Sequence, residues 1–319
     1  MGKILVTSSH WDALCQEAAK MLAEAGHEVV VHRGDVPYLP HDELIRVIGD
    51  IDGAISGLDQ WTEDIYAAAP KLKVIAKFGV GTDNMDKPAA KKYGIKVINA
   101  PGINSNAVAE LTIGMIVDIL RGVTMQHGAM TRGRWPRYLG EELRGKTVGL
   151  LGFGAIAKLV AKKLQCFDVT VIASDLYPDF ETAKAYNVQI VSSDEVITCS
   201  DIVSIHIPST TETYHMFNDE LFAKMKPGAY LVNAARGAIV DSDALVRALE
   251  SGRLAGAALD ALEKEPLPPD DPLLTCGKTV CTCHTGAETR EIYQNVSVCV
   301  AQGVIDVLDG REPQFWVNR

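Results

Sequence analysis

Short apolar runs alternate with stretches of helical periodicity along the whole chain. The runs that predict strands are 3–7, 28–32, 53–56, 72–77 and 96–99 in the first part, and 147–151, 170–174, 202–207, 230–234, 255–259 and 280–282 in the second. Strands joined through helices lie parallel in a sheet, because the chain must cross back before the next strand begins. The pattern therefore predicts an α/β fold in two parts, each with a parallel sheet.

The segments between these runs carry signals of helix starts and stops. Gly26 follows the first of them as a C-terminal stop, and Asp86 can cap the third. Segment 106–121 is apolar on more than one face, which is typical of a helix packed in a core or between subunits. Segment 263–272 is rich in proline and acidic residues and is expected to be a loop. The predicted helices are 11–25, 62–69, 87–93, 106–121, 155–165 and 285–308.

Length and charge narrow the class of protein. The chain has 319 residues, which favours two domains of ordinary size. Its net charge of −10 argues against a general nucleic-acid binder, which needs a basic face, and against docking on anionic membranes. The first residues lack the apolar core of a secretory signal, and no stretch approaches the roughly 20 apolar residues that span a bilayer. Seven cysteines, an odd number, then indicate free thiols in a reducing cytoplasm.

A glycine-rich loop follows strand 147–151 and opens helix 155–165. Gly152 permits a tight turn, Gly154 lets backbone N–H groups approach a pyrophosphate, and Ala157 supplies the small residue needed where helix and strand pack. An anion is favoured there by the free N–H groups and the dipole at the helix N-terminus. The residues of this loop that we expect to bind a dinucleotide are Gly152, Phe153, Gly154, Ala155 and Ile156.

An acidic residue supports the dinucleotide interpretation of this loop, which by itself could be an ordinary strand-to-helix turn. Asp175 ends the next strand, about 20 residues beyond the loop, where a carboxylate can accept hydrogen bonds from the adenosine ribose. A negative charge at that position would also repel the 2′-phosphate of NADP. The alternative for Asp175 is a plain turn residue, but strand, loop, helix, strand and acid stand in the expected order. The sequence therefore predicts NAD as the cofactor.

Three polar residues follow strands of the second part, where ligands collect in open parallel sheets. Arg236 stands among small residues and suits a bidentate grip on a carboxylate, Glu265 lies in an acidic loop, and His284 comes directly after a strand. Each has a plain alternative: a surface ion pair, a solvated loop carboxylate and a structural histidine. Together with the glycine loop they indicate a catalytic site.

Eight motifs in order resemble those of the D-2-hydroxyacid dehydrogenase family and cover nearly the whole chain. They are 79–84 (GVGTDN), 106–110 (NAVAE), 152–157 (GFGAIA), 206–208 (HIP), 233–237 (NAARG), 258–260 (ALD), 265–266 (EP) and 284–287 (HTGA). The resemblance implies two Rossmann-like parallel-sheet domains with a cleft between them. A flavodoxin-like substrate domain would comprise residues 1–99 and 288–319, and an NAD-binding Rossmann domain would comprise residues 100–287.

The resemblance also implies the reaction, which is hydride transfer between NAD(H) and a 2-hydroxy or 2-oxo acid. The family's catalytic Arg, Glu and His fall on Arg236, Glu265 and His284. Arg236 would hold the substrate carboxylate and polarise the neighbouring carbonyl. His284 would exchange the proton of the hydroxyl, and Glu265 would orient the imidazole and favour its charged form.

Further binding residues follow from the resemblance. The substrate would be bound by Lys77, Phe78, Gly79, Val80, Gly81, Asn104 and Arg236. Besides the glycine loop and Asp175, the cofactor would be bound by His206, Ile207, Pro208, Thr213, Ala234, Ala235, Asp260, His284, Gly286 and Ala287. The resemblance implies a homodimer formed through the cofactor domain.

The choice of substrate stays open between related acids. A cation at Lys77 could meet a phosphate, so we favour D-3-phosphoglycerate and a role in serine biosynthesis; glyoxylate or hydroxypyruvate reduction is the enzymatic alternative. An NAD-sensing corepressor is the alternative from another class. The chain departs from the family where Ala157 replaces a third glycine and Cys283 replaces the proline before the histidine. The cysteines near His284 lack the paired spacing of a zinc site, and no metal is expected.

Overall fold

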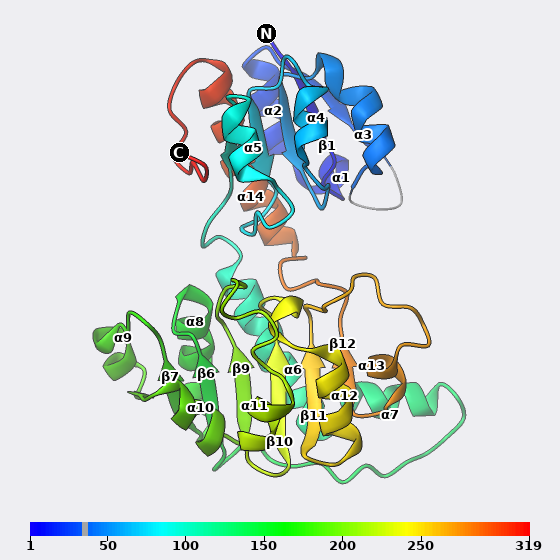
Figure 1. Cartoon of the computed structure of the whole chain (residues 1–319), viewed down its shortest axis with the longest axis vertical. Helices are drawn as coiled ribbons and strands as arrows, with labels where there is room; N and C mark the ends of the chain where they lie inside the picture. Colours follow the sequence, from blue (N-terminus) through cyan, green and yellow to red (C-terminus); the bar gives the residue numbers. More distant parts are fainter. Residues whose placement is uncertain (34–37) are drawn as a thin grey trace. The chain divides into compact units, whose positions relative to one another are not determined.

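The computed structural model describes residues 1–33 and 38–319, which form two compact units. The first unit comprises Met1–Asn104 and Ala287–Arg319, and the second comprises Ser105–Gly286. The divisions thus lie a few residues from positions 99/100 and 287/288, which the motifs suggested. Each unit is built on a parallel sheet covered by helices, which confirms the predicted α/β class (Figure 1).

The first unit has a five-stranded sheet in the order β2-β1-β3-β4-β5. Every neighbouring pair is parallel. This order is that of the flavodoxin-like fold, which the motif resemblance implied. Its strands are β1 Lys3–Val6, β2 Glu28–Val31, β3 Gly53–Ser56, β4 Val74–Lys77 and β5 Lys96–Ile98. Its helices are α1 Trp11–Leu14, α2 Gln16–Glu24, α3 His41–Val47, α4 Glu63–Ala67, α5 Lys87–Lys92 and α14 Arg290–Leu308, with the short 3₁₀ helix η1 Ile48–Asp50.

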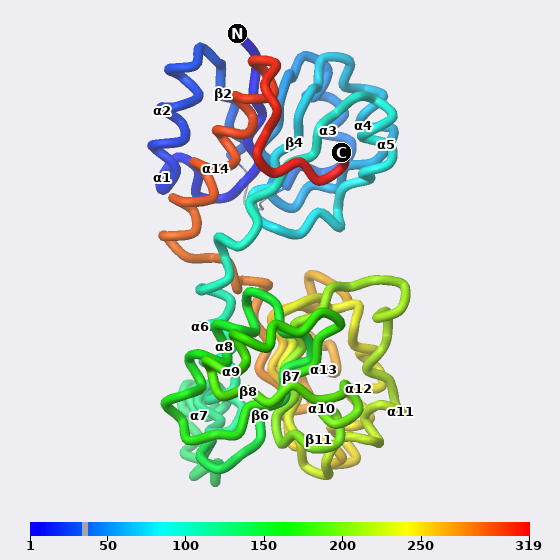
Figure 2. The backbone as a smooth tube through the Cα atoms, turned by 90° about the vertical axis from the view of Figure 1, so that its left-hand side faces the viewer, coloured from blue at the N-terminus to red at the C-terminus, as the bar shows by residue number. Residues whose placement is uncertain are grey.

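The last long helix, α14, returns to the first unit. It packs beside α2 and against β3 and β4, as Figure 2 shows for the helix pair. Gly303 on this helix has no room for a side chain, because an added Cβ would lie 2.4 Å from Cδ1 of Ile98. The apolar face of α14 therefore completes the core of a unit whose other residues lie almost 200 positions earlier.

Two helix boundaries differ from those expected. The helix predicted over 11–25 is interrupted at Cys15, whose φ of −112° and ψ of 32° are not helical. The helix predicted from residue 285 begins at Arg290, because the Thr289 side chain caps it by accepting a hydrogen bond from the N–H of Ile292. Residues 285 and 286 are instead held in a turn by a buried carboxylate described below.

The second unit has a seven-stranded parallel sheet in the order β12-β11-β10-β9-β6-β7-β8. The order reverses between β6 and β9, and ligands of open α/β sheets bind at such a switch point, outside the carboxyl ends of the strands. The short strand β8 was not expected from the sequence. The strands are β6 Thr147–Leu151, β7 Thr170–Ser174, β8 Val188–Ile190, β9 Ile202–Ile205, β10 Ala229–Asn233, β11 Leu254–Leu259 and β12 Thr279–Cys281.

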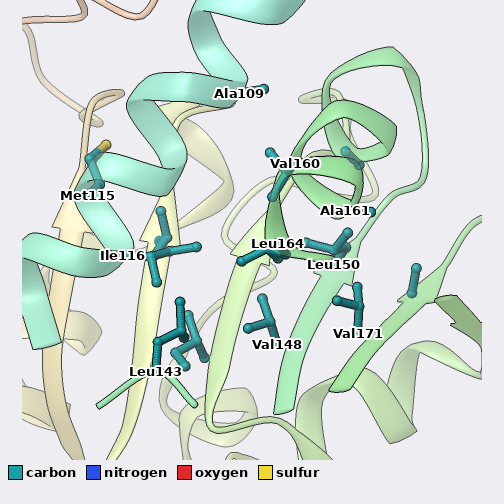
Figure 3. Packing of buried hydrophobic residues seen from close by; sticks show 14 of the residues in the cluster. Ala109, Met115, Ile116, Leu143, Val148, Leu150, Val160, Ala161, Leu164 and Val171 are labelled. Carbon is teal, nitrogen blue, oxygen red and sulfur yellow. The ribbon is translucent and has the colours of Figure 1, made fainter. Parts of the chain in front are cut away.

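Helices cover both faces of this sheet. One apolar cluster joins the sheet to α6 and α8, and another joins it to α10, α11 and α12. Figure 3 shows Met115 and Ile116 of α6 in the first cluster with Val148 and Val160. Segment 106–121 is thus a core helix, as its pattern predicted. The helices are α6 Ser105–Arg121, α7 Val123–Met130, α8 Ala155–Leu164, α9 Phe180–Ala185, α10 Ser193–Cys199, α11 Asp219–Lys224, α12 Ser242–Glu250 and α13 Pro272–Thr275, with η2 Gln165–Phe167 and η3 Gly237–Ile239.

None of the described helices is both long and apolar enough to cross a lipid bilayer. The seven cysteines all lie within the described residues and are free thiols. Outside positions 34–37, no cluster of three or more His, Cys, Asp or Glu residues could hold a metal ion.

Candidate functional site

The loop between β6 and α8 has the geometry of an anion site. Gly152 has a φ of +95°, and an added Cβ would lie 2.7 Å from the carbonyl oxygen of His206, so the turn requires glycine. Gly154 differs, because an added Cβ there would meet no heavy atom within 4 Å. No side chain caps α8 at Gly154, which leaves its first N–H groups without a partner from the helix. This open, N–H-rich position fits a phosphate of the predicted dinucleotide.

The carboxylate of Asp175 is fixed beside that loop. It accepts hydrogen bonds from the N–H groups of Phe153 at 2.7 Å and Tyr177 at 2.8 Å. Ala157 is fully buried in the apolar cluster under α8, so the alanine that replaces a third glycine packs against the strand without disturbing the loop. Strand, loop, helix and acid therefore stand together as the sequence predicted.

His284 and Glu265 form an ion pair in the second unit. Nδ1 of His284 lies 2.9 Å from Oε2 and 3.1 Å from Oε1 of Glu265. Leu262 donates its N–H to Oε1 of Glu265 at 2.9 Å, which fixes the other side of the carboxylate. His284 has a φ of +55°, so its backbone is in the left-handed region that few residues other than glycine adopt.

The pair shifts both pKa values toward the charged forms. The hydrogen bond that His284 donates to Glu265 raises the pKa of His284 against the opposing effect of burial, and the charge of Asp260 adds to the rise. Burial would raise the pKa of Glu265, but the hydrogen bonds from His284 and Leu262 and the nearby charge of Arg236 lower it on balance. The pair therefore favours an imidazolium facing a carboxylate.

Arg236 follows β10 in a loop held by a buried amide. Asn233 is fully buried, accepts the N–H of Ala235 at 3.0 Å and donates to the carbonyl of Arg236 at 2.9 Å. Nη1 of Arg236 donates to the carbonyl of Ala235 at 2.8 Å. Its positive charge opposes the protonation of His284, so guanidinium and imidazole lie within electrostatic reach of each other. The three residues predicted to be catalytic therefore lie together in the second unit.

Gly237 allows the Arg236 loop and the Glu265 loop to touch. An added Cβ at Gly237 would lie 2.0 Å from the carbonyl of Leu262 and 2.4 Å from the nitrogen of Glu263. No side chain fits there. The glycine is thus required by the close approach of two backbones, since its own φ is not in the positive range.

Asp260 has a role that the sequence did not reveal. It is 2% exposed and accepts hydrogen bonds from the hydroxyl of Thr282 at 2.6 Å and from the N–H groups of Thr285 at 2.7 Å and Gly286 at 2.9 Å. These three donors flank His284, so Asp260 anchors the turn that carries the imidazole. The motif resemblance assigned Asp260 to the cofactor and did not indicate this anchor, for which the threonine and glycine near His284 are the only signal in the sequence.

The remaining predicted cofactor residues lie mainly on loops after β9 and β10. Nε2 of His206 is 2.9 Å from the hydroxyl of Ser204, and burial lowers the pKa of His206 to about 4, so its ring is neutral. Thr213 donates to the carbonyl of Pro208 at 2.8 Å and so closes the loop after β9. Gly286 is the last residue of the second unit and Ala287 the first that returns to the first unit. Ile207 lies on the loop after β9, and Ala234 and Ala235 lie on the loop after β10.

The predicted substrate residues other than Arg236 lie in the first unit. The loop 78–81 follows β4 and is held by the two residues after β5, since Ala100 donates its N–H to the carbonyl of Gly79 and Asn99 donates its side chain to the carbonyl of Val80, both at 2.8 Å. Within the described residues, no hydrogen bond is found from the N–H groups of Val80 and Gly81. Asn104 ends the first unit.

Lys77 lies directly before this loop. It is 8% exposed, and its ammonium donates to the carbonyl of Gly57 at the end of the neighbouring strand β3. Phe78 packs on Tyr293 of α14, with ring centroids 5.1 Å apart. The loop 78–81 is thus preceded by the buried Lys77, and its first residue, Phe78, packs in an aromatic pair.

Comparison with known proteins decides the family. The model of the D-isomer specific 2-hydroxyacid dehydrogenase NAD-binding domain matches residues 113–286. This chain belongs to the D-isomer specific 2-hydroxyacid dehydrogenase family. The predictions of an NAD-dependent oxidoreductase and of NAD as its cofactor are confirmed with it.

Relatives within this family carry several names. The chain is 42% identical to a glyoxylate reductase of Thermofilum pendens, over 92% of this chain and 88% of the relative. It is 40% identical to a D-3-phosphoglycerate dehydrogenase of Methanocaldococcus jannaschii, over 100% of this chain but only 60% of that longer relative. The crystal structure of D-lactate dehydrogenase with NAD⁺ from Lactobacillus jensenii has 28% identity and a TM-score of 0.78, covering 99% of this chain and 100% of that one.

Proposed function

We propose that this family member transfers a hydride between NAD(H) and a 2-hydroxy or 2-oxo acid. The observation that carries the proposal is the ion pair between His284 and Glu265, with the charge of Arg236 in reach of both. When bound, NAD supplies the hydride acceptor or donor. The protein must then hold the acid, manage one proton and stabilise charge on the substrate oxygen.

Each residue of the trio has one task in this proposal. Arg236 binds the substrate carboxylate through its planar guanidinium and polarises the adjacent carbonyl. His284 gives its proton to the developing alkoxide during reduction and takes it back during oxidation. Glu265 keeps the imidazole protonated and oriented, because it accepts from Nδ1 and leaves Nε2 for the substrate. The N–H groups of Val80 and Gly81 are further donors for the carboxylate.

The dinucleotide is assigned to the loop after β6. Gly154 and the N-terminal turn of α8 would hold the pyrophosphate, and Asp175 would bind the adenosine ribose. His206, Pro208, Thr213, Ala234 and Ala235 would contact the rest of the cofactor from the loops after β9 and β10. A neutral His206 suits a position beside a cofactor that carries a positive nicotinamide in one of its two states.

D-3-phosphoglycerate and its 2-oxo acid are the proposed substrate pair. Lys77 supports this choice, because a buried ammonium at the carboxyl end of β4 can meet a second anionic group. The similarity to D-3-phosphoglycerate dehydrogenases over the whole chain agrees with it. A role in serine biosynthesis and a cytoplasmic location would follow.

Glyoxylate is the second candidate substrate. It is favoured by the 42% identity to a glyoxylate reductase whose length this chain nearly matches. Glyoxylate has no distal anion, so it would need Arg236 but not the charge of Lys77. The two candidates therefore differ in their dependence on one side chain.

A steady-state assay tests the proposed reaction. NADH or NADPH oxidation is followed with a panel of 2-oxo acids that includes 3-phosphohydroxypyruvate, hydroxypyruvate and glyoxylate. We expect turnover with NADH. His284→Asn should lower the rate to about 1% of its starting value or less, since general acid catalysis contributes roughly 10²-fold or more. Unchanged turnover in His284→Asn would refute the mechanism. Tight NADH binding without turnover on any acid would favour the NAD-sensing alternative.

A homodimer is proposed through the segment at the end of α7 and directly after it. Residues 130–139 are all exposed, and within them Trp135 is 79% and Leu139 94% exposed. Large apolar side chains gathered on one exposed segment are typical of a protein interface. Light scattering should give twice the mass of 34.5 kDa, and Trp135→Asp should return it to the monomer.

A further inference from the structure

Three loops at the carboxyl edge of the second sheet meet at His215. Its N–H donates to the carbonyl of Ala238 at 2.9 Å, and the N–H of Phe217 donates to Ile239 at 3.0 Å. These bonds join the loop after β9 to the loop after β10, which carries Arg236. The backbone of His215 has a φ of +49° at this junction. Neither the motifs nor the proposed reaction gives this residue a function.

The side chain of His215 reaches the third loop. Its Nε2 lies 2.7 Å from Oε1 of Glu263, and its Nδ1 lies 3.9 Å from a carboxylate oxygen of Asp241. The ring of Tyr214 stacks on the imidazole, with centroids 4.0 Å apart and an interplanar angle of 12°. The imidazole is thus held in one orientation between a ring and two carboxylates.

Glu263 is held from its other side by a helix. Its Oε2 accepts the N–H of Ser242 at 3.2 Å, in the first turn of α12, where the helix dipole favours a negative charge. These bonds from Ser242 and His215 lower the pKa of Glu263 although burial opposes them. Glu263 is therefore a fixed carboxylate in a chain segment that has no helix or strand between β11 and α13.

The fixed position of Glu263 matters because of its neighbours in sequence. Leu262 donates the N–H that holds Oε1 of Glu265, and the backbone of Leu262 and Glu263 leaves no room at Gly237. Any rotation of this segment would move Glu265 away from His284. The side chain of Glu265 is itself 36% exposed, so water could replace its bond to the imidazole.

We propose that His215 is a positioning residue, which acts through Glu263 to hold the segment 262–265 in place and so keeps the Glu265 carboxylate on Nδ1 of His284. This inference rests on the proposed function where it concerns turnover. It makes a separate claim about the His284–Glu265 pair, and that claim can be measured without any reaction.

The direct measurement is the titration of His284 by NMR. The groups that set its pKa are Glu265, Asp260 and Arg236. His215→Gly removes the imidazole without strain, because glycine accepts a positive φ. We expect His215→Gly to lower the pKa of His284 toward its ordinary value of 6.5, and His215→Gln, whose amide can donate to Glu263, to restore most of the rise. His127→Gly, at an exposed position of α7 in the same unit, is the control and should change nothing.

A double-mutant cycle tests whether His215 acts through Glu265. We expect His215→Gly to lower kcat/KM for 2-oxo acid reduction by about tenfold, in line with the loss caused by a misplaced catalytic group. In a Glu265→Gln background the same change should cost less than about twofold, because the interaction it supports is already gone. NADH affinity, measured by fluorescence, should stay the same in all four proteins.

The outcomes separate this inference from the proposed function. An unchanged pKa of His284 in His215→Gly would overturn the positioning role, as would an equal tenfold loss with and without Glu265. If the unmodified protein reduces no 2-oxo acid, the proposed function fails, but the NMR titration still decides the role of His215.

Discussion

Oε2 of Glu265 lies 2.9 Å from Nδ1 of His284, although the two residues reach this contact from separate loops. Glu265 follows β11 and His284 follows β12, and these two strands are neighbours in the sheet. The contact therefore depends on parallel pairing, which brings the carboxyl ends of both strands to one edge. The pKa of the His284 imidazole therefore depends on the position of the loop that carries Glu265.

The pH dependence of reduction should follow the pKa of His284. Its folded-state pKa is raised by Glu265, and the reduction needs the protonated ring, so kcat/KM should be constant at low pH and fall as pH rises through the raised value. Glu265→Gln should move this fall to lower pH and reduce the plateau about tenfold or more. Glu250→Gln, at the end of α12, is the control. A profile that Glu265→Gln leaves in place would contradict the assignment.

The same pair should link stability to pH. A group whose folded pKa exceeds its unfolded value stabilises the fold at pH values below the unfolded value, and this contribution is lost as pH rises through the folded pKa. For His284 that loss should begin near pH 6.5, the ordinary pKa of histidine, and be complete above the raised pKa of the folded state. Urea unfolding of His284→Asn should lack this loss, whereas the unmodified protein should show it. Equal pH slopes for both proteins above pH 6 would rule the linkage out.

Two glycines of the β6–α8 loop should respond differently to alanine. Gly154→Ala should cost no more than about 1 kcal/mol of unfolding free energy, since alanine is a poorer N-cap, but should weaken NADH binding at least tenfold because its Cβ enters the open position. Gly152→Ala should cost about 2 kcal/mol or more, because its φ is positive and its Cβ meets a carbonyl. Calorimetry and fluorescence titration give both quantities. Normal NADH affinity in Gly154→Ala would contradict the proposal that this loop binds a phosphate of the cofactor.

Removing the anchor at Asp260 should affect both stability and activity. Asp260→Ala leaves the N–H groups of Thr285 and Gly286 without their acceptor, and each such loss costs roughly 1–3 kcal/mol. We expect a loss of about 3 kcal/mol in urea unfolding and at least a tenfold lower kcat in the fraction that stays folded. Asp270→Ala, in an exposed loop of the same unit, should be neutral. Full activity of folded Asp260→Ala would show that the turn holds His284 without it.

Asp175 should control the choice between the two dinucleotides. Asp175→Ser removes the charge that would repel a 2′-phosphate, so the ratio of kcat/KM for NADPH to that for NADH should rise at least tenfold. The change also removes acceptors for the N–H groups of Phe153 and Tyr177, so some loss with NADH is expected. Asp194→Ser on α10 is the matched control. An unchanged ratio would count against the ribose-binding role.

Lys77 should separate the two candidate substrates. Lys77→Gln removes the charge but keeps a donor for the carbonyl of Gly57. If the distal phosphate is bound there, KM for 3-phosphohydroxypyruvate should rise about tenfold or more, with little change for glyoxylate. Equal effects on both acids would assign Lys77 a structural role and would favour glyoxylate.

Patterns of nearby residues were sufficient to predict the features that depend on interactions between nearby residues. The glycine loop, the strand before it and Asp175 could be predicted, because a turn, a helix start and a short apolar run depend on nearby residues. The break at Cys15 and the short strand β8 were missed, since a single non-helical residue and three paired residues leave no periodic signal. The start of α14 was displaced because Asp260 holds residues that helical periodicity alone would have included.

By itself the sequence determined the α/β class and the glycine loop with its acidic partner, and it pointed to Arg236, Glu265 and His284 as candidate catalytic residues. Only the tertiary structure decided which groups hold these residues in place. Asp260 bonds to a turn more than 20 positions later, and His215 bonds to Glu263 at a separation of 48. Such contacts arise when parallel strands bring distant loops to one sheet edge, and no local pattern encodes them. The anchors of the site therefore became visible only in the fold.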